Sequence, residues 1–368
     1  MKQFIKRIFQ TLLGISLLLL ISGFVITYFF SEKVEKTVIN KIQEQMTSEL
    51  QLGDVAFSLY EKFPSASVKI TDLLAFEKKG FNNDTLFYAK NTYIELSVID
   101  IILEKVDIKK VVVDNGYINI KYDSDNNPNF AIFKTNEKSN NKLTLNNLLL
   151  INTHISFNRK DVNLNWKTQE AVLSFSEKEI IINAKIFSEK LIINNQDYIH
   201  KKQMRLHTTL EVIKDSILIQ KGSTVNIENV KIELSGEIFQ GTIIDLDFSC
   251  EDQELINIIK NTPEYLKSIY SSFQADGIVT CNGNIKGLIS KESNPYLDMT
   301  CNIEKGNFNL KSRPFILKNV SLNAKINNGE QFDFHNTKIE ISDFDAKTEN
   351  GFIKGDFSIQ NLNKYYLT

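Results

Sequence analysis

The stretch VKIELS, Val230–Ser235, indicates the fold class, because apolar and polar residues alternate along it without a break. The two sets are Val230, Ile232 and Leu234 on one side and Lys231, Glu233 and Ser235 on the other. Successive side chains of a β-strand point to opposite faces. A period of two therefore predicts a strand with one apolar and one charged face.

The same alternation extends outward from this strand. Between residues 143 and 250 it recurs in short stretches separated by Asn, Asp, Lys and Gly, as in an antiparallel meander. Its apolar positions include Ile180, Ile182 and Ile186. Further upstream the apolar positions are Ile94, Leu96 and Val98, and then Ile118 and Ile120. Helical segments do not alternate with these strands, so a parallel βαβ architecture is not expected.

Two stretches depart from this alternation and have the spacing of amphipathic helices. Residues 31–50 predict a helix that serves either as a stalk or as a cap on the first edge of the sheet. Residues 251–274 predict a helical insertion. We expect this insertion to separate two sheet segments, residues 51–250 and residues 275–368.

An uncharged apolar run, Ile8–Phe30, precedes all of these stretches. As a helix it reaches roughly 35 Å, enough to cross a hydrocarbon core of roughly 30 Å. Lys2, Lys6 and Arg7 stand before it, which places the N-terminus in the cytoplasm. The alternative, a cleaved signal peptide, has a shorter core and a small-residue cleavage site, whereas this run ends in bulky aromatics. Residues 1–30 therefore predict a cytoplasmic tip and a single-pass anchor, with the bulk of the chain outside.

The sequence gives no indication of catalysis or of nucleic-acid binding. Lys and Arg total 43 against 45 for Asp and Glu, a net charge of -2, so no global field attracts nucleic acid. The histidines lack a metal-ligand spacing, and no phosphate loop or nucleophile elbow is present. Asp245 with Asp247, and Asp343 with Asp345, fit a solvated sheet face better than an active site. We expect no enzyme, no cofactor and no metal.

The three cysteines, Cys250, Cys281 and Cys301, are too few and too far apart for a stabilising disulfide framework. The favoured interpretation is that they are small apolar side chains on buried strand faces. A bridge between Cys281 and Cys301 stays open as the alternative, because both lie in strand-like stretches.

A set of segments over about a hundred residues resembles the N-terminal region of the AsmA family, and so does the anchor before them. The segments are Phe57–Leu59, Phe63-Pro64, Ile102–Ile108, Val113–Ile120, Asp123 and Asn129-Phe130. Where the family usually has a Gly before the Asn-aromatic pair, this chain has Asn126-Asn127-Pro128. Residues 275–368 resemble, more loosely, the repeated middle section of AsmA-like chains from Bacteroidota, in a short or truncated member.

This resemblance implies an envelope protein of Gram-negative bacteria, related to bridge-like lipid transfer proteins. In that class an elongated, curved antiparallel β-sheet with a few capping helices has an apolar concave face that carries phospholipid acyl chains. The implied localisation is the inner membrane, with a cytoplasmic N-terminus and a periplasmic bulk. The implied partners are the inner membrane, phospholipids and outer-membrane or envelope proteins, in outer-membrane biogenesis.

Two functions follow as expectations. In the first, an apolar β-groove binds phospholipids and transfers them between the inner and outer membranes. The candidate groove residues are Ile94, Leu96, Val98, Ile118, Ile120, Ile180, Ile182, Ile186, Val230, Ile232 and Leu234. In the second, the protein is an envelope scaffold or outer-membrane protein assembly factor that pairs its sheet edge with a client strand.

The predicted topology is testable on cells. Because the positive charges before the run Ile8–Phe30 hold the N-terminus in the cytoplasm, protease added to spheroplasts is expected to degrade the chain beyond Phe30. Immunoblotting with antibodies against that part of the chain measures the loss. Protection that ends only when the inner membrane is opened would show the opposite orientation.

Overall fold

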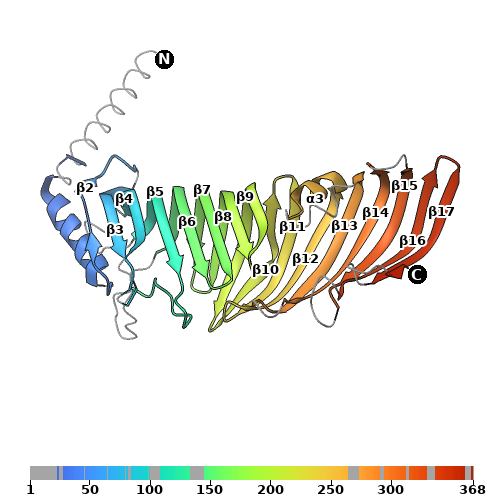
Figure 1. Cartoon of the computed structure of the whole chain (residues 1–368). Helices are drawn as coiled ribbons and strands as arrows, with labels where there is room; N and C mark the ends of the chain where they lie inside the picture. The colour runs from blue at the N-terminus through green and yellow to red at the C-terminus, as the bar shows by residue number, and fades with distance from the viewer. Residues whose placement is uncertain are drawn as a thin grey trace, which may run out of the picture. The chain divides into compact units, whose positions relative to one another are not determined.

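The computed structural model describes most of the chain (Figure 1). The chain forms two compact units, residues 1–154 and 155–368. Strands dominate both units, as the alternation predicts. The described residues are 23–24, 28–44, 46–63, 65–78, 80–81, 84–97, 99, 108–132, 145–263, 273–290, 294–311, 315–329, 336–360 and 366–367.

The predicted anchor, Ile8–Phe30, lies mostly outside the described residues. Within the described part of the chain, no helix has both the length and the apolar character that crossing a bilayer requires. Membrane anchoring therefore stays a prediction from the sequence.

The first unit is a small antiparallel sheet covered by a helix of residues 28–44. Strands β1 and β2 both pair with β3, which pairs with β4, which in turn pairs with β5. The next strand, β6, runs across the boundary between the units. The strand bounds are β1 Leu50–Gln51, β2 Val55–Ser58, β3 Ala66–Phe76, β4 Thr85–Leu96, β5 Ile108–Lys121 and β6 Asn147–Arg159.

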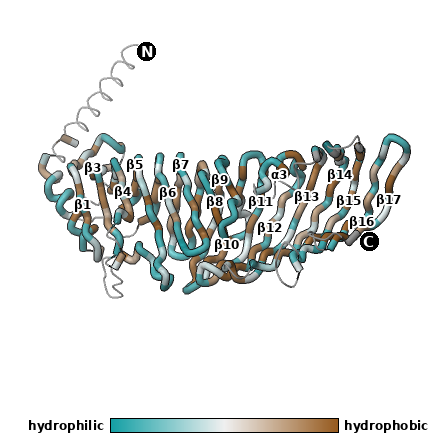
Figure 2. The backbone as a smooth tube through the Cα atoms, viewed as in Figure 1, coloured by the Kyte–Doolittle hydropathy of each residue, from teal (hydrophilic) through white to brown (hydrophobic). Residues whose placement is uncertain are grey.

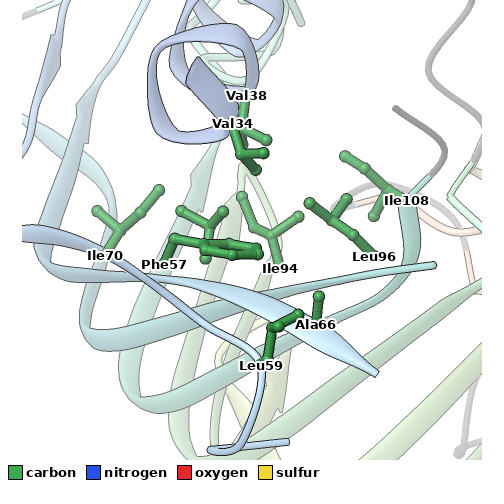
Figure 3. Close-up of a cluster of buried hydrophobic side chains, with 10 residues drawn as sticks. Val34, Val38, Phe57, Leu59, Ala66, Ile70, Ile94, Leu96 and Ile108 are labelled. Carbon is green, nitrogen blue, oxygen red and sulfur yellow. The ribbon is translucent and has the colours of Figure 1, made fainter. Parts of the chain in front are cut away.

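The helix of residues 28–44 packs on a face of this sheet, whereas the sequence predicted either a stalk or a cap on the first edge. Val34 and Val38 project from it toward the sheet (Figure 3). They pack with Phe57, Leu59, Ala66, Val68, Ile70, Ile94, Leu96 and Ile108. The described helix ends at residue 44, and Leu50 already belongs to a strand, so the predicted helix 31–50 was too long at its C-terminal end.

Because the helix of residues 28–44 covers this face of the sheet, the first two groove candidates are not available to a ligand. Ile94 and Leu96 are only 3% and 1% exposed, because the helix closes over them. They form part of a closed core and cannot line an open groove. Ile118 and Ile120 are half-buried in β5, with Ile118 opposite Phe87. Val98 lies outside the described residues.

A buried polar cluster fixes the loop that follows β5. Asn129 has no exposed surface, and its side-chain amide donates to Glu77 Oε1 (2.9 Å) and to the carbonyl oxygen of Asn119 (2.8 Å). Its Oδ1 accepts from the backbone N–H of Lys121 (2.9 Å). All three bonds are internal, so the side chain replaces the water it loses on burial. The Asn of the Asn129-Phe130 pair thus has a structural role.

The second unit is an antiparallel meander in which each strand pairs with the next in the chain (Figure 1). Asn194 and Asn195, between β8 and β9, both have positive φ (51° and 64°), as a two-residue type I′ hairpin requires. The strands are β7 Val162–Phe175, β8 Glu179–Ile193, β9 Gln196–Ile213, β10 Ser216–Ile227, β11 Val230–Phe239, β12 Ile243–Glu254, β13 Phe273–Leu288, β14 Tyr296–Leu310, β15 Phe315–Asn327, β16 Lys338–Thr348, β17 Gly351–Gln360 and β18 Tyr366–Leu367.

The helical insertion predicted at residues 251–274 does not divide the sheet, and its residues 264–272 lie outside the described residues. The helix α3 spans Leu255–Asn261, β12 continues to its start, and β13 begins at Phe273. Strands β12 and β13 pair directly with each other across this connection. The prediction of two separate sheet segments was therefore wrong, because helical spacing reveals a helix but not whether the flanking strands meet.

The closed core of the first unit gives a stability prediction. Ile70→Ala removes a fully buried side chain and is expected to lower the free energy of unfolding by about 2–5 kcal/mol. The control Lys90→Ala, on the exposed position of β4, is expected to change it by at most about 0.5 kcal/mol. Urea unfolding followed by circular dichroism measures both. Equal effects of the two substitutions would contradict the packing of this core.

Candidate functional site

The pairing of strands in the second unit lines up apolar side chains in rows that cross many strands. One row passes from β11 to β17 through Leu234, Phe248, Gly283, Met299, Ile326, Ile339 and Ile359. The next row is Cys250, Cys281, Cys301, Ala324, Ile341 and Phe357. We call the side of the β8–β17 sheet that contains these rows the apolar face. In Figure 2 the strands alternate accordingly between hydrophobic and hydrophilic residues.

The apolar face brings together the six groove candidates of this unit. Ile186 of β8 connects through Met204 and Ile227 to Val230 of β11 in one row. The neighbouring row joins Ala184, Leu206, Val225 and Ile232. The predicted groove residues that lie on this face are Ile180, Ile182, Ile186, Val230, Ile232 and Leu234.

Most of the apolar face is only half covered. Ile186 and Val230 are buried (3% and 4% exposed), but all seven members of the row from Leu234 to Ile359 keep partial exposure. Side chains in a closed core lose nearly all of theirs, as Ile70 does in the first unit. These side chains are in contact with their neighbours in the sheet, and part of their surface stays accessible.

The cover that the structure does provide is local. Among the described residues of the second unit, α3 is the only α-helix. Leu255 at its start is buried with Ala275 and Val279. Around these three pack Ile258, Ile259, Cys281, Cys301, Ile303 and Phe308. A helix of seven residues reaches roughly 10 Å, so it can cover only a few strands of the sheet.

The opposite side of the sheet, the polar face, is tied together by cross-strand hydrogen bonds. Asn302 Nδ2 donates to Asn323 Oδ1 (2.8 Å), and Thr300 Oγ1 donates to Asn282 Oδ1 (2.8 Å). One of its rows contains Glu233, Ser249, Asn282, Thr300, Lys325, Glu340 and Ser358. Such pairs between neighbouring strands stabilise their register.

The two aspartate pairs considered from sequence lie on this polar face. Asn284 Nδ2 donates to Asp245 Oδ1 (3.0 Å) and to Asp247 Oδ1 (2.9 Å). A hydrogen bond from Lys286, and then one from Asn284, lower the pKa of the Asp245 carboxyl below its usual value. Asp343 accepts from Asn323, and Asp345 pairs with Lys354. Their predicted position on a solvated face is confirmed.

Two hollows of this unit are lined mostly by residues of the polar face, with residues of the apolar rows between them, whereas the sequence placed a groove on the apolar face. One hollow has a volume of about 610 Å³, and its lining includes the polar residues Glu233, Asp247, Asn282, Asn284, Thr300 and Lys325. Leu234, Phe248, Gly283 and Met299 of the first apolar row also contribute to this lining. A second, of about 730 Å³, is lined among others by Asn323, Lys325, Glu340, Ser342 and Asp356. The apolar row from Leu234 to Ile359 keeps partial exposure, so this part of the apolar face is an open surface.

Among the described residues, no group of three or more His, Cys, Asp or Glu side chains could hold a metal ion, and His335 lies outside them.

Cys281 and Cys301, directly opposite each other in β13 and β14, form a disulfide with a Cα–Cα distance of 4.2 Å. The favoured prediction of three free cysteines was thus wrong for this pair and holds for the buried Cys250.

Gly283 allows the side chains around it on the apolar face to approach one another. A Cβ at this position would lie 2.8 Å from the Phe248 ring and 2.6 Å from both Met299 Cβ and the Asp298 carbonyl oxygen. Gly283→Ala is therefore expected to lower the free energy of unfolding by about 1–3 kcal/mol. The control Gly351→Ala meets no atom within 4 Å and should change it by at most about 0.5 kcal/mol. Thermal melting measures the stability of both variants. Equal stability of the two would contradict this packing.

Comparison with protein-family models, with curated proteins and with solved structures found no match for this chain. The AsmA resemblance of the segments between Phe57 and Phe130 therefore stays a prediction from sequence. The function has to be inferred from the chemistry of the two faces of the second unit.

Proposed function

We propose that the apolar face of the second unit binds the acyl chains of phospholipids. The observation that supports this proposal most strongly is the row from Leu234 to Ile359, in which every member keeps part of its surface exposed. A contiguous apolar surface of this kind is rare on a soluble monomer and usually marks a binding site for another apolar group.

The dimensions of the row suit an acyl chain. Neighbouring strands are about 4.8 Å apart, so the six steps from β11 to β17 span roughly 29 Å. One leaflet of a hydrocarbon core is roughly 15 Å thick, and an acyl chain fills about that length. Each CH₂ group transferred from water to an apolar surface contributes about 0.8 kcal/mol, so even partial contact along the row gives substantial affinity.

The cellular role that we propose combines this face with the sequence. The uncharged run Ile8–Phe30 would anchor the protein in the inner membrane, with residues after it in the periplasm. The resemblance to AsmA-like proteins then favours transfer of phospholipids between the inner and outer membranes. Because the row from Leu234 to Ile359 keeps partial exposure, we propose binding to an open apolar sheet and not to an enclosed tunnel.

A second candidate function, pairing with a client strand, has one observation in its favour. In the described part of the chain, β18 pairs with β17 only at Ile359 and Gln360. Phe352 of β17 is 71% exposed. A strand added along β17 would continue the sheet and cover this side chain.

Two neighbouring isoleucines of β8 allow a matched test of the lipid proposal. Ile182 lies on the apolar face opposite Leu173 and Thr208, whereas Ile181 points to the polar face and is 37% exposed. Ile182→Asp is expected to leave the protein folded, because the carboxylate can reach water when lipid leaves, and to reduce the bound phospholipid several-fold. Ile181→Asp introduces the same charge on the other face and should leave the lipid content unchanged.

Lipid extraction and mass spectrometry of the purified full-length variants measure phospholipid per protein, and thermal melting reports whether they fold. A folded Ile182→Asp variant with undiminished lipid would contradict binding at this face. An unfolded one would show that the site is a closed core, since a buried, unpaired carboxylate costs several kcal/mol. Equal loss of lipid in both variants would place the lipid elsewhere.

A further inference from the structure

All three cysteines of the chain lie in one row on three adjacent strands of the second unit. Cys250 of β12 is directly opposite Cys281 of β13, and Cys281 is directly opposite Cys301 of β14. Cys281 and Cys301 form a disulfide, and Cys250 is buried with a free thiol. This row lies on the apolar face, but a reaction among the three cysteines depends neither on lipid binding nor on the pairing of β17.

The hydrogen-bond pattern of the sheet shows which distances to expect within the row. The Cα–Cα distance of 4.2 Å between Cys281 and Cys301 is typical of a non-hydrogen-bonded antiparallel pair. A residue that is not hydrogen-bonded to one neighbouring strand is hydrogen-bonded to the other. Cys250 and Cys281 therefore form the wider type of pair, with Cα atoms about 5.5 Å apart, within the range of about 4.4–6.8 Å that disulfides span.

The backbone next to Cys250 departs from regular pairing. The register between β12 and β13 shifts between Cys250 and Gln253, and Asp252 has a positive φ of 49°. Side chains of a hydrogen-bonded pair stand farther apart than a disulfide prefers, so bridging needs a small movement of one strand. The irregular stretch directly after Cys250 is where β12 can make that movement.

We propose that this row is a site of intramolecular thiol–disulfide exchange, in which Cys250 displaces Cys301 from the bridge to Cys281. The Cys250 thiol loses its proton, and its Sγ attacks the Sγ of Cys281. The bond between Cys281 and Cys301 breaks, the new bond joins Cys250 to Cys281, and the Cys301 thiolate takes up a proton. One disulfide and one thiol are present before and after, so no oxidant or reductant is consumed.

Both the direction of attack and the choice of partner follow from the row. The row places Cys250 and Cys301 on opposite sides of Cys281, so Cys250 approaches the Cys281 sulfur from the side opposite the leaving Cys301, as displacement at sulfur requires. Cys250 and Cys301 are two strand spacings apart, roughly 9.6 Å, which exceeds the reach of a disulfide. Cys281 is therefore the only shared partner.

The exchange would move a covalent link from one pair of strands to another beside α3. Cys281 and Cys301 pack against the cluster around Leu255, and α3 follows directly after β12. Burial raises the pKa of the Cys250 thiol, so little thiolate is present and the reaction is slow. The product bridge would tie β13 to the strand from which α3 emerges, in place of β14.

Alkylation of the full-length protein without reductant tests the exchange. Cys301 has a free thiol only after Cys250 has attacked Cys281, so N-ethylmaleimide is expected to label Cys301 slowly in the parent protein. In Cys250→Ser the same bridge is present without an attacking thiol, and labelling of Cys301 should fall at least tenfold. Lysines lie between the three cysteines in sequence, so tryptic peptides separate them for mass spectrometry.

Two further variants identify the bridge that forms. After oxidation with glutathione disulfide, Cys301→Ser should yield a linked peptide pair containing Cys250 and Cys281, whereas Cys281→Ser should yield no link between Cys250 and Cys301. The proposal would be overturned if Cys301 stays unlabelled in the parent while Cys250 is labelled. It would also be overturned if Cys301 is labelled equally fast in the parent and in Cys250→Ser.

Discussion

The register between neighbouring strands is the constraint on which the second unit depends. Because side chains alternate along a strand, a shift of one residue between β11 and β12 would move Phe248 to the side of Glu233 and Ser235. The observed pairing instead keeps Leu234 opposite Phe248, and the same parity holds through to Ile359 in β17. Hydrogen bonds on the polar face, such as those from Asn284 to Asp245 and Asp247, stabilise this register from the other side.

Strands of both units have one apolar and one polar side, but the apolar side is covered to a different extent in each unit. In the first, Val34 and Val38 of the helix of residues 28–44 close over Ile70 and Leu96, and the apolar side becomes a core. In the described part of the second, α3 packs on the apolar face around Leu255. Among the described residues, the two units differ in the area that helices cover, which is why we place the binding function on the second unit.

The strands and the faces of their side chains could be predicted from sequence. The predictions that were wrong share one cause, because they concern contacts between residues distant in sequence. Alternation such as that of Val230–Ser235 correctly gave the strands and the face of each side chain. It could not distinguish Ile94, under a helix, from Ile232, which is partly exposed, because cover comes from residues distant in sequence. The Cys281–Cys301 bridge and the hollows depend on register and on sheet geometry, which periodicity does not specify.

Native mass spectrometry of the full-length protein, released from detergent, tests the central claim most directly. If the half-exposed row from Leu234 to Ile359 binds acyl chains, the protein should retain co-purified phospholipid, visible as discrete mass increments that collisional activation removes. A protein that appears without lipid, or as a lipid-free complex of two copies, would show that protein and not phospholipid covers the apolar face, and would contradict the account.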